Sequence, residues 1–231
     1  MKPISISAGL LAAGLWASVP LSAQADTLNE GFDNLTALIS TGWILTNASF
    51  PAGQPWFQGN SGIFAAQAGA DDSYAAVNFN STTAVSGSVD NWLISPVMTI
   101  DAGSILSFYT QASDAGFMDL LEVRFSSGSG ADVSGFSTLL AQVGSAATAN
   151  YPVGAWTLVT AAMPVTGSGR IAFHYSVADA SNASYIGIDT LSVGAVPEPA
   201  TLGLLGLGLG FVNIARRRAR RASQPEGGLQ S

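Results

Sequence analysis

The sequence predicts an all-β sandwich over residues 26–195, and three observations support this. Short runs of β-branched and aromatic residues alternate with Gly, Ser, Asn, Asp and Pro along this span. No stretch of it carries a sustained 3.6-residue apolar period. The third observation is strict alternation late in the chain, where one face holds Ile171, Phe173, Tyr175 and Val177 and the other holds Ala172, His174 and Ser176.

Each predicted strand is a short apolar or aromatic run between turn residues. In chain order the strands are expected at 27–32, 43–46, 63–67, 74–79, 92–95, 105–110, 120–126, 138–142, 156–161, 170–177 and 185–193. Alternation recurs in the seventh, where Leu121, Val123 and Phe125 oppose Glu122 and Arg124. About 170 residues with this many strands can bury a substantial core between two sheets.

Charge is distributed very unevenly in this chain of 231 residues. Residues 26–195 hold thirteen acidic residues and only two basic ones, Arg124 and Arg170, which gives this span a formal charge of −11. Such a surface repels nucleic acid and anionic lipid, so a nucleic-acid partner is excluded. The chain has no cysteine, so disulfides and thiolate metal sites are excluded as well.

Residues 1–25 are predicted to be a signal peptide. Lys2 precedes an apolar stretch rich in Ala, Gly and Leu, and small residues follow at Ala23 and Ala25. This Ala-x-Ala pattern is what signal peptidase requires, so we expect export through the Sec machinery and cleavage after Ala25.

The end of the chain combines three features in a fixed order. Pro197, Glu198 and Pro199 interrupt any helix or sheet ladder. The mostly apolar run 200–215 would form a helix of about 24 Å, somewhat shorter than a hydrocarbon core of about 30 Å. A basic stop-transfer cluster follows it, formed by Arg216, Arg217, Arg218, Arg220 and Arg221.

In this order the three features resemble the PEP-CTERM sorting signal of Gram-negative bacteria. The resemblance assigns 196–221 to the signal and its single transmembrane helix, with 222–231 as a short cytoplasmic tail. It implies that an exosortase recognises Pro197, Glu198 and Pro199 and cuts near them. The precursor would be anchored in the inner membrane, and the mature protein would reach the cell surface or the extracellular space.

A second resemblance covers nearly all of residues 26–195. It rests on an ordered series of motifs: Asn29-Glu30-Gly31-Phe32-Asp33, Asn91-Trp92-Leu93-Ile94-Ser95-Pro96, Ile171-Ala172-Phe173-His174-Tyr175 and Ile188-Asp189-Thr190-Leu191-Ser192-Val193. This series is similar to the choice-of-anchor J domains, which are related to cleaved-adhesin and MAM-like domains. The resemblance implies a jelly-roll β-sandwich used in adhesion or attachment.

Catalysis is not expected. A Ser-His-Asp mechanism needs a histidine, and the only one, His174, lies mid-strand between Phe173 and Tyr175, where a surface or sheet-packed role is expected. No Gly-x-Ser-x-Gly motif surrounds a serine. A glycosidase would need two carboxylates about 5–10 Å apart in a cleft, and acidic residues in loops are common without that role.

Calcium is the one cofactor for which the sequence offers donors. The second resemblance implies that the first and last strands are neighbours, so that Glu30 and Asp33 would share an ion with Asp189. Hard cations take six to eight oxygens from carboxylates, amides and carbonyls. The alternative is that these acids only stabilise turns.

Aromatic residues provide the second candidate site. Trp43, Trp92 and Trp156 lie within hydrophobic runs, where core packing is expected. Trp56 and Phe57 lie between glycines and a proline, and are the best candidates for an exposed platform that stacks on sugar. Two function classes remain open: an adhesin-like module that binds exopolysaccharide or biofilm matrix, and a structural coat protein without a ligand. A carbohydrate-active enzyme is the distant third.

Overall fold

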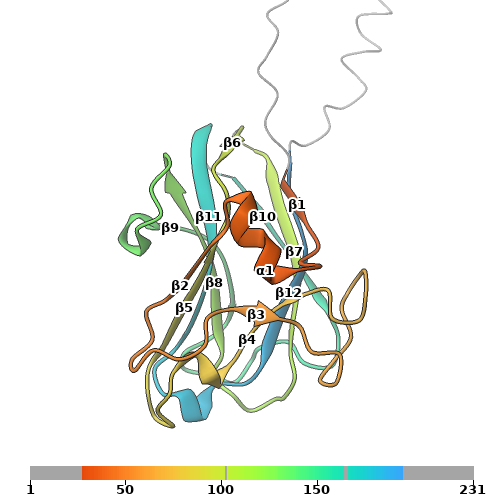
Figure 1. Cartoon of the computed structure of the whole chain (residues 1–231), viewed down its shortest axis with the longest axis vertical. Coiled ribbons are helices and arrows are strands. Elements are labelled where there is room, and N and C mark those ends of the chain that lie inside the picture. Colours follow the sequence, from red (N-terminus) through yellow and green to blue (C-terminus); the bar gives the residue numbers. More distant parts are fainter. Residues whose placement is uncertain (1–27, 102, 164–165, 195–231) are drawn as a thin grey trace, which may run out of the picture.

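The computed structural model describes residues 28–101, 103–163 and 166–194. These residues form two antiparallel sheets of six strands each, which face one another as a sandwich (Figure 1). The predicted all-β sandwich is therefore confirmed. Within these three ranges no helix is long and apolar enough to cross a bilayer, and the predicted membrane helix at 200–215 lies outside them.

The first sheet has the order β10-β7-β12-β4-β3, with β1 paired to the free part of β12. Its strands are β1 (Leu28–Glu30), β3 (Phe57–Gln58), β4 (Ala75–Val77), β7 (Ile105–Ala112), β10 (Thr157–Ala162) and β12 (Ile186–Gly194). Leu28 pairs with Val193, so the first and last described strands lie side by side, as the second resemblance implied.

The second sheet has the order β2-β5-β11-β8-β9, with β6 paired to the beginning of β11. Its strands are β2 (Ile44–Asn47), β5 (Val89–Ile94), β6 (Met98–Ile100), β8 (Leu120–Ser127), β9 (Thr138–Gly144) and β11 (Gly167–Val177). The long strand β11 is central, because it pairs with β5 along one edge and with β8 along the other.

The core lies between the two sheets and follows the alternation seen in the sequence. Ile171, Phe173 and Tyr175 of β11 are fully buried in it. Phe173 meets Phe108 of β7 across the sandwich, with ring centroids 5.0 Å apart and an interplanar angle of 80°. This edge-to-face contact joins β7, an interior strand of the first sheet, to β11, the central strand of the second.

Within the described ranges, helical structure is limited to short connections. The one-turn helix α1 (Leu35–Leu38) begins where the Asn34 side chain accepts a hydrogen bond from the backbone N–H of Ala37, and it buries Leu35 and Leu38. The 3₁₀ turns are η1 (Ile39–Thr41), η2 (Phe79–Ser81), η3 (Val133–Gly135) and η4 (Ala180–Asn182).

One predicted strand, 63–67, is wrong, because this segment belongs to a loop that covers the outer face of the first sheet. Phe64 packs there on Tyr74, with centroids 5.0 Å apart, and on Trp156. The backbone N–H of Phe64 donates to Asn60 O, and that of Gln67 donates to the side chain of Asp189. These amides therefore bond to a turn and a carboxylate instead of a sheet ladder.

Candidate binding site

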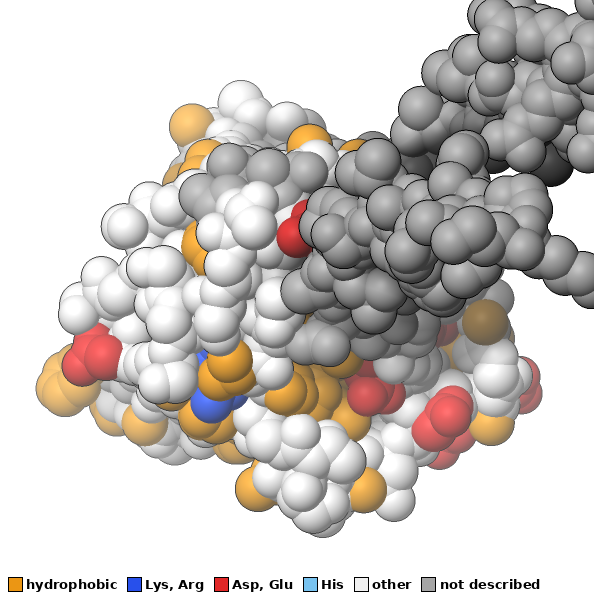
Figure 2. Space-filling view, turned by 90° about the horizontal axis from the view of Figure 1, so that it is seen from above, with side chains coloured by type: hydrophobic (Ala, Val, Ile, Leu, Met, Phe, Trp, Pro, Cys, Tyr) orange, Lys and Arg blue, Asp and Glu red, His pale blue; other side chains and the backbone are white. Residues whose placement is uncertain are grey.

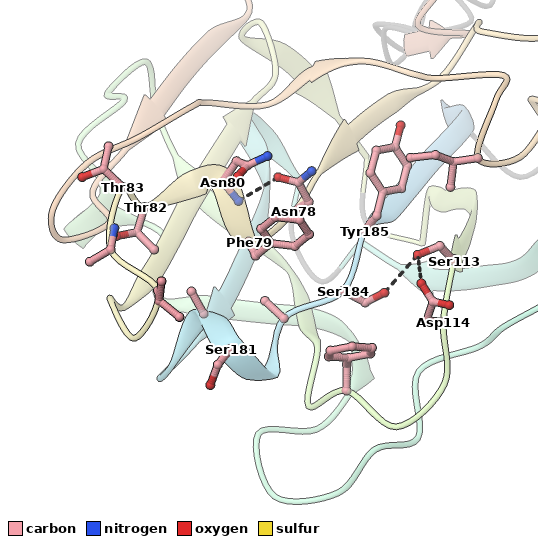
Figure 3. Close-up of a pocket in the computed structure, with 16 residues that line it drawn as sticks. Asn78, Phe79, Asn80, Thr82, Thr83, Ser113, Asp114, Ser181, Ser184 and Tyr185 are labelled. Atoms are coloured by element: carbon pink, nitrogen blue, oxygen red, sulfur yellow. Dashed lines mark hydrogen bonds between the residues drawn. The ribbon is translucent and has the colours of Figure 1, made fainter.

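A pocket of about 660 Å³ opens at one end of the sandwich, and we call it the end pocket. Three connections form most of its lining: residues 78–85 between β4 and β5, residues 113–117 between β7 and β8, and residues 180–185 between β11 and β12 (Figure 3). Ile63, from the loop between β3 and β4, completes it. Each of the three connections carries the chain from one sheet to the other. The end pocket therefore lies where loops from both sheets converge.

An exposed aromatic ring stands in the end pocket. Phe79 begins η2, lines the end pocket and is 49 % exposed. Asn78 caps η2, and its Oδ1 accepts the backbone N–H of Asn80 at 2.8 Å. Thr82 and Thr83 lie to one side of Phe79 in Figure 3, and Asp114 lies to the other.

The polar side of the end pocket is ordered by short hydrogen bonds. Ser113 Oγ donates to Asp114 Oδ2 at 2.7 Å and lies 3.1 Å from Ser184 Oγ. The Ser184 N–H donates to Asp119 Oδ1 at 2.8 Å, beneath the pocket floor. Hydrogen bonds thereby connect the exposed Asp114 to the partly buried Ser113 and the buried Ser184.

Sequence reasoning did not select the end pocket, because its residues meet only after the loops converge. The strand predicted at 74–79 ends with Asn78 and Phe79, and Asn80 follows it. The available signal was an aromatic residue flanked by two amides at the point where the apolar run ends.

A second pocket, of about 360 Å³, contains two of the three predicted calcium ligands. Glu30 and Asp33 both line it, together with Gly69, Thr190 and Ser192, and we call it the acid pocket. Burial, joined by repulsion from Asp33, raises the pKa of the Glu30 carboxyl, although its Oε1 accepts the Phe32 N–H at 2.8 Å.

Asp189 lies next to the acid pocket but uses its carboxylate internally. It is fully buried, and its Oδ2 accepts the N–H groups of Gln67 at 2.8 Å and Ala68 at 3.1 Å. Its Oδ1 accepts the N–H of Thr190. Within the described ranges no group of three or more His, Cys, Asp or Glu residues is arranged around a common point for a metal ion.

The predicted exposed platform at Trp56 is wrong. Trp56 is 2 % exposed and belongs to the main core, and the next residue, Phe57, faces the opposite side of the sheet. There Phe57 is half-buried, with its ring edge-on to Tyr185 at 5.8 Å. Trp56 packs in the main core and Phe57 in the cluster on the outer face of the first sheet, so the two neighbours cannot form one platform.

His174 is sheet-packed, as expected. Its ring stacks on Trp92 with centroids 3.8 Å apart, its Nε2 lies 3.0 Å from Asp90 Oδ1, and its Nδ1 lies 3.2 Å from Glu122 Oε2. Both ring nitrogens are thus occupied by carboxylates. No hydroxyl of the described part of the chain is hydrogen-bonded to the ring, so this arrangement offers no activated nucleophile.

The remaining predicted site residues lie outside the described ranges. They are the signal-peptidase positions Ala23 and Ala25, the sorting residues Pro197, Glu198 and Pro199, and the cluster of Arg216, Arg217, Arg218, Arg220 and Arg221. The described part of the chain ends at Gly194, which is also the last residue of β12.

Comparisons with known proteins bear on both parts of the chain. Residues 195–221 match the model of the PEP-CTERM protein-sorting motif. A search of curated proteins gave no match. The K1 cleaved adhesin domain of Lys-gingipain from Porphyromonas gingivalis W83 is similar in structure, with a TM-score of 0.55 and 24% sequence identity over 74% of this chain and 99% of that one.

The K2 cleaved adhesin domain of Lys-gingipain is similar as well, with a TM-score of 0.52 and 20% identity over 73% of this chain and 99% of that one. At these identities the likeness establishes the fold. The sorting motif implies an exported protein that is an exosortase substrate. The chain therefore carries a PEP-CTERM protein-sorting motif directly behind a β-sandwich with the fold of the cleaved adhesin domains.

Proposed function

We propose that this chain is an exported surface or matrix protein, processed by an exosortase, whose β-sandwich is a non-catalytic, adhesin-like module that binds exopolysaccharide. The observation that carries the proposal is the position of the sorting motif, which begins at residue 195, immediately after β12 ends at Gly194. The sorting signal is thus joined to a folded domain without a linker. This arrangement supports delivery of the folded domain to the outside of the cell.

The surface chemistry of the sandwich supports a neutral polymer as the ligand. Figure 2 shows acidic side chains at several places on the face that it presents, and little positive charge. The two arginines of the described ranges are engaged: Arg124 pairs with Glu122 at 3.0 Å, and Arg170 donates to Ser95 O at 2.6 Å. An anionic polymer would find repulsion and no free guanidinium.

The test is retention of the full chain, purified from the producing cell, on that cell's own exopolysaccharide, first with calcium and then with a chelator. Retention in the presence of calcium supports the adhesin. Absence of retention in both buffers overturns it and favours a structural coat protein without a ligand.

We also propose a calcium ion in the acid pocket, held by Glu30 and Asp33 together with backbone carbonyls. The like charges of these two carboxylates would be relieved by a cation. The backbone supports a specialised loop here, since Phe32 and Thr190 both adopt left-handed conformations, with φ of 53° and 50°. Asp189, whose carboxylate accepts three N–H groups, would support the site indirectly by holding residues 67–68 in place.

Thermal unfolding with and without chelator tests the ion. We expect the Tm to fall on chelation for the wild type, and not for an Asp33→Asn variant, while Asp114→Asn, an exposed acid of the end pocket, behaves as wild type. An unchanged wild-type Tm would remove the calcium proposal and leave the adhesin proposal to its own test.

A further inference from the structure

We propose that the end pocket is a saccharide-binding site that accepts a neutral sugar chain, with the exposed ring of Phe79 as its stacking platform. The inference rests on the proposed function and deepens it, because it assigns the binding to a particular site and a particular class of sugar.

The first argument is the exposed apolar surface at the end pocket. Phe79 is 49 % exposed, and Val85 and Ile63, also pocket residues, are 84 % and 44 % exposed. Tyr185 also lines the pocket and is buried. Its hydroxyl lies 3.1 Å from Tyr74 Oη, so Tyr185 contributes its ring to the lining and not its hydroxyl. Apolar side chains gathered in one concave place indicate a binding site.

The second argument is the placement of polar groups beside that ring. Asn78 and Asn80 flank Phe79 in sequence, and Asp114 lies across the pocket from Thr82 in Figure 3. The Asn80 amide and the Thr83 hydroxyl have no hydrogen-bond partner within the described part of the chain. Asp114 uses only Oδ2 internally, which leaves Oδ1 as an acceptor. Amides, a hydroxyl and a carboxylate around an aromatic face match the hydroxyl-rich edge and the C–H face of a sugar ring.

The third argument is charge and size. The end-pocket lining includes one carboxylate, Asp114, and no Lys, Arg or His. Uronic-acid or sulfated chains would meet a like charge with no compensating cation, so a neutral chain is favoured. A volume of about 660 Å³ is within the range of pockets that hold small ligands, roughly 300–1,000 Å³.

The position of the end pocket, opposite the sorting motif, also suits a protein that is displayed on a surface. The first and last described strands pair at Leu28 and Val193, and η2 and η4 lie at the opposite end of the sandwich (Figure 1). β12 runs the whole distance between these ends, from Ile186 beside the end pocket to Gly194, a length of about 25 Å. The end pocket is thus directed away from the point where the sorting motif begins.

The experiment measures binding of the full chain to a panel of short oligosaccharides, by titration calorimetry and by chemical shifts of labelled protein. Neutral chains of glucose, galactose, xylose or mannose are compared with uronic-acid chains and with an apolar peptide. We expect at least one neutral chain to bind, and Phe79→Ala to weaken that binding at least tenfold. Asn80→Ala should weaken it severalfold. Leu158→Ala, which truncates a residue 51 % exposed on the edge strand β10, is the matched control and should bind as wild type.

Three results would overturn the inference: no neutral chain binds, uronic-acid chains or the apolar peptide bind better, or Phe79→Ala binds the neutral chain as tightly as wild type. All three substitutions are at exposed residues and should leave the fold intact. The Tm of each variant checks this, so that a loss of binding is not mistaken for unfolding. Retention on native exopolysaccharide separates the two proposals. A Phe79→Ala protein that is still retained there leaves the proposed function standing and removes the end pocket as its site.

Discussion

Asp119 shows how a single buried carboxyl affects this fold. It is 1 % exposed, and its Oδ1 accepts hydrogen bonds from Tyr175 Oη at 2.6 Å and from the Ser184 N–H. Its Oδ2 is buried without a partner in the described part of the chain. Burial therefore raises the pKa of Asp119 above its ordinary value of 3.8, although the two hydrogen bonds oppose the shift.

This raised pKa predicts the sign of a pH effect for Asp119→Asn. A group whose pKa is higher in the folded state binds more protons there, so its stabilising contribution is complete at low pH and is lost as the pH rises through the folded-state pKa. Asparagine does not titrate. The variant should therefore gain stability relative to wild type as the pH rises from about 4 to about 7. Urea unfolding at both pH values measures the gain.

A stability difference for Asp119→Asn that stays constant between the two pH values would contradict the argument.

At the scale of elements, the two sheets depend on the contact between β7 and β11. Phe173 is fully buried against Phe108, and truncation would leave a cavity between the two sheets. We expect Phe173→Ala to lower the free energy of unfolding by about 3–5 kcal/mol. Leu158→Ala, on the exposed edge strand β10, should change it by no more than about 0.5 kcal/mol. Denaturant titration distinguishes the two, and equal losses would mean that the β7–β11 contact is not central.

The loop before β4 is a second element with a defined support, the carboxylate of Asp189. Three N–H groups donate to it, two of them from the loop at Gln67 and Ala68. Asp189→Asn replaces one carboxylate oxygen by an NH2 group, which cannot accept a hydrogen bond from these N–H groups. We expect faster hydrogen exchange at Gln67 and Ala68 and a loss of about 1–3 kcal/mol in stability.

Asp33→Asn serves as the comparison for Asp189→Asn, because no hydrogen bond joins the Asp33 side chain to the two loop amides. Unchanged exchange at Gln67 and Ala68 in the Asp189→Asn variant would show that the loop is held by its aromatic packing alone.

The sequence predicted most reliably the strands whose own side chains show the burial pattern. β8, β11 and β12 were found because alternating burial is written into their side chains, as in Leu121, Val123 and Phe125. β3 and β6 were missed because these segments of two and three residues show no period and lie next to prolines, at Pro55 and Pro96, where the sequence indicated loops. The burial of Trp56 and the convergence of loops around Phe79 depend on contacts between distant segments, which one sequence does not display.

At the scale of the whole molecule, the two proposed functions lie at opposite ends of the sandwich. One end carries the adjacent strands β1 and β12, where the sorting motif begins, and the other carries the end pocket (Figure 1). If the end pocket binds a sugar chain as proposed, delivery at one end and binding at the other need no movement between them. Attachment and binding would then be independent of each other.

This independence predicts the result of processing. The ladder partners of β12 end at Gly194, so a cut near Pro197, Glu198 and Pro199 removes no residue of the sheet. The mature protein should have an intact mass that excludes residues 200–231, and it should have the same Tm and oligosaccharide affinity as the precursor. Glu198→Ala should keep the precursor in the membrane fraction with its binding unchanged. A mature wild-type protein that still ends at Ser231 would instead identify the segment as a plain membrane anchor.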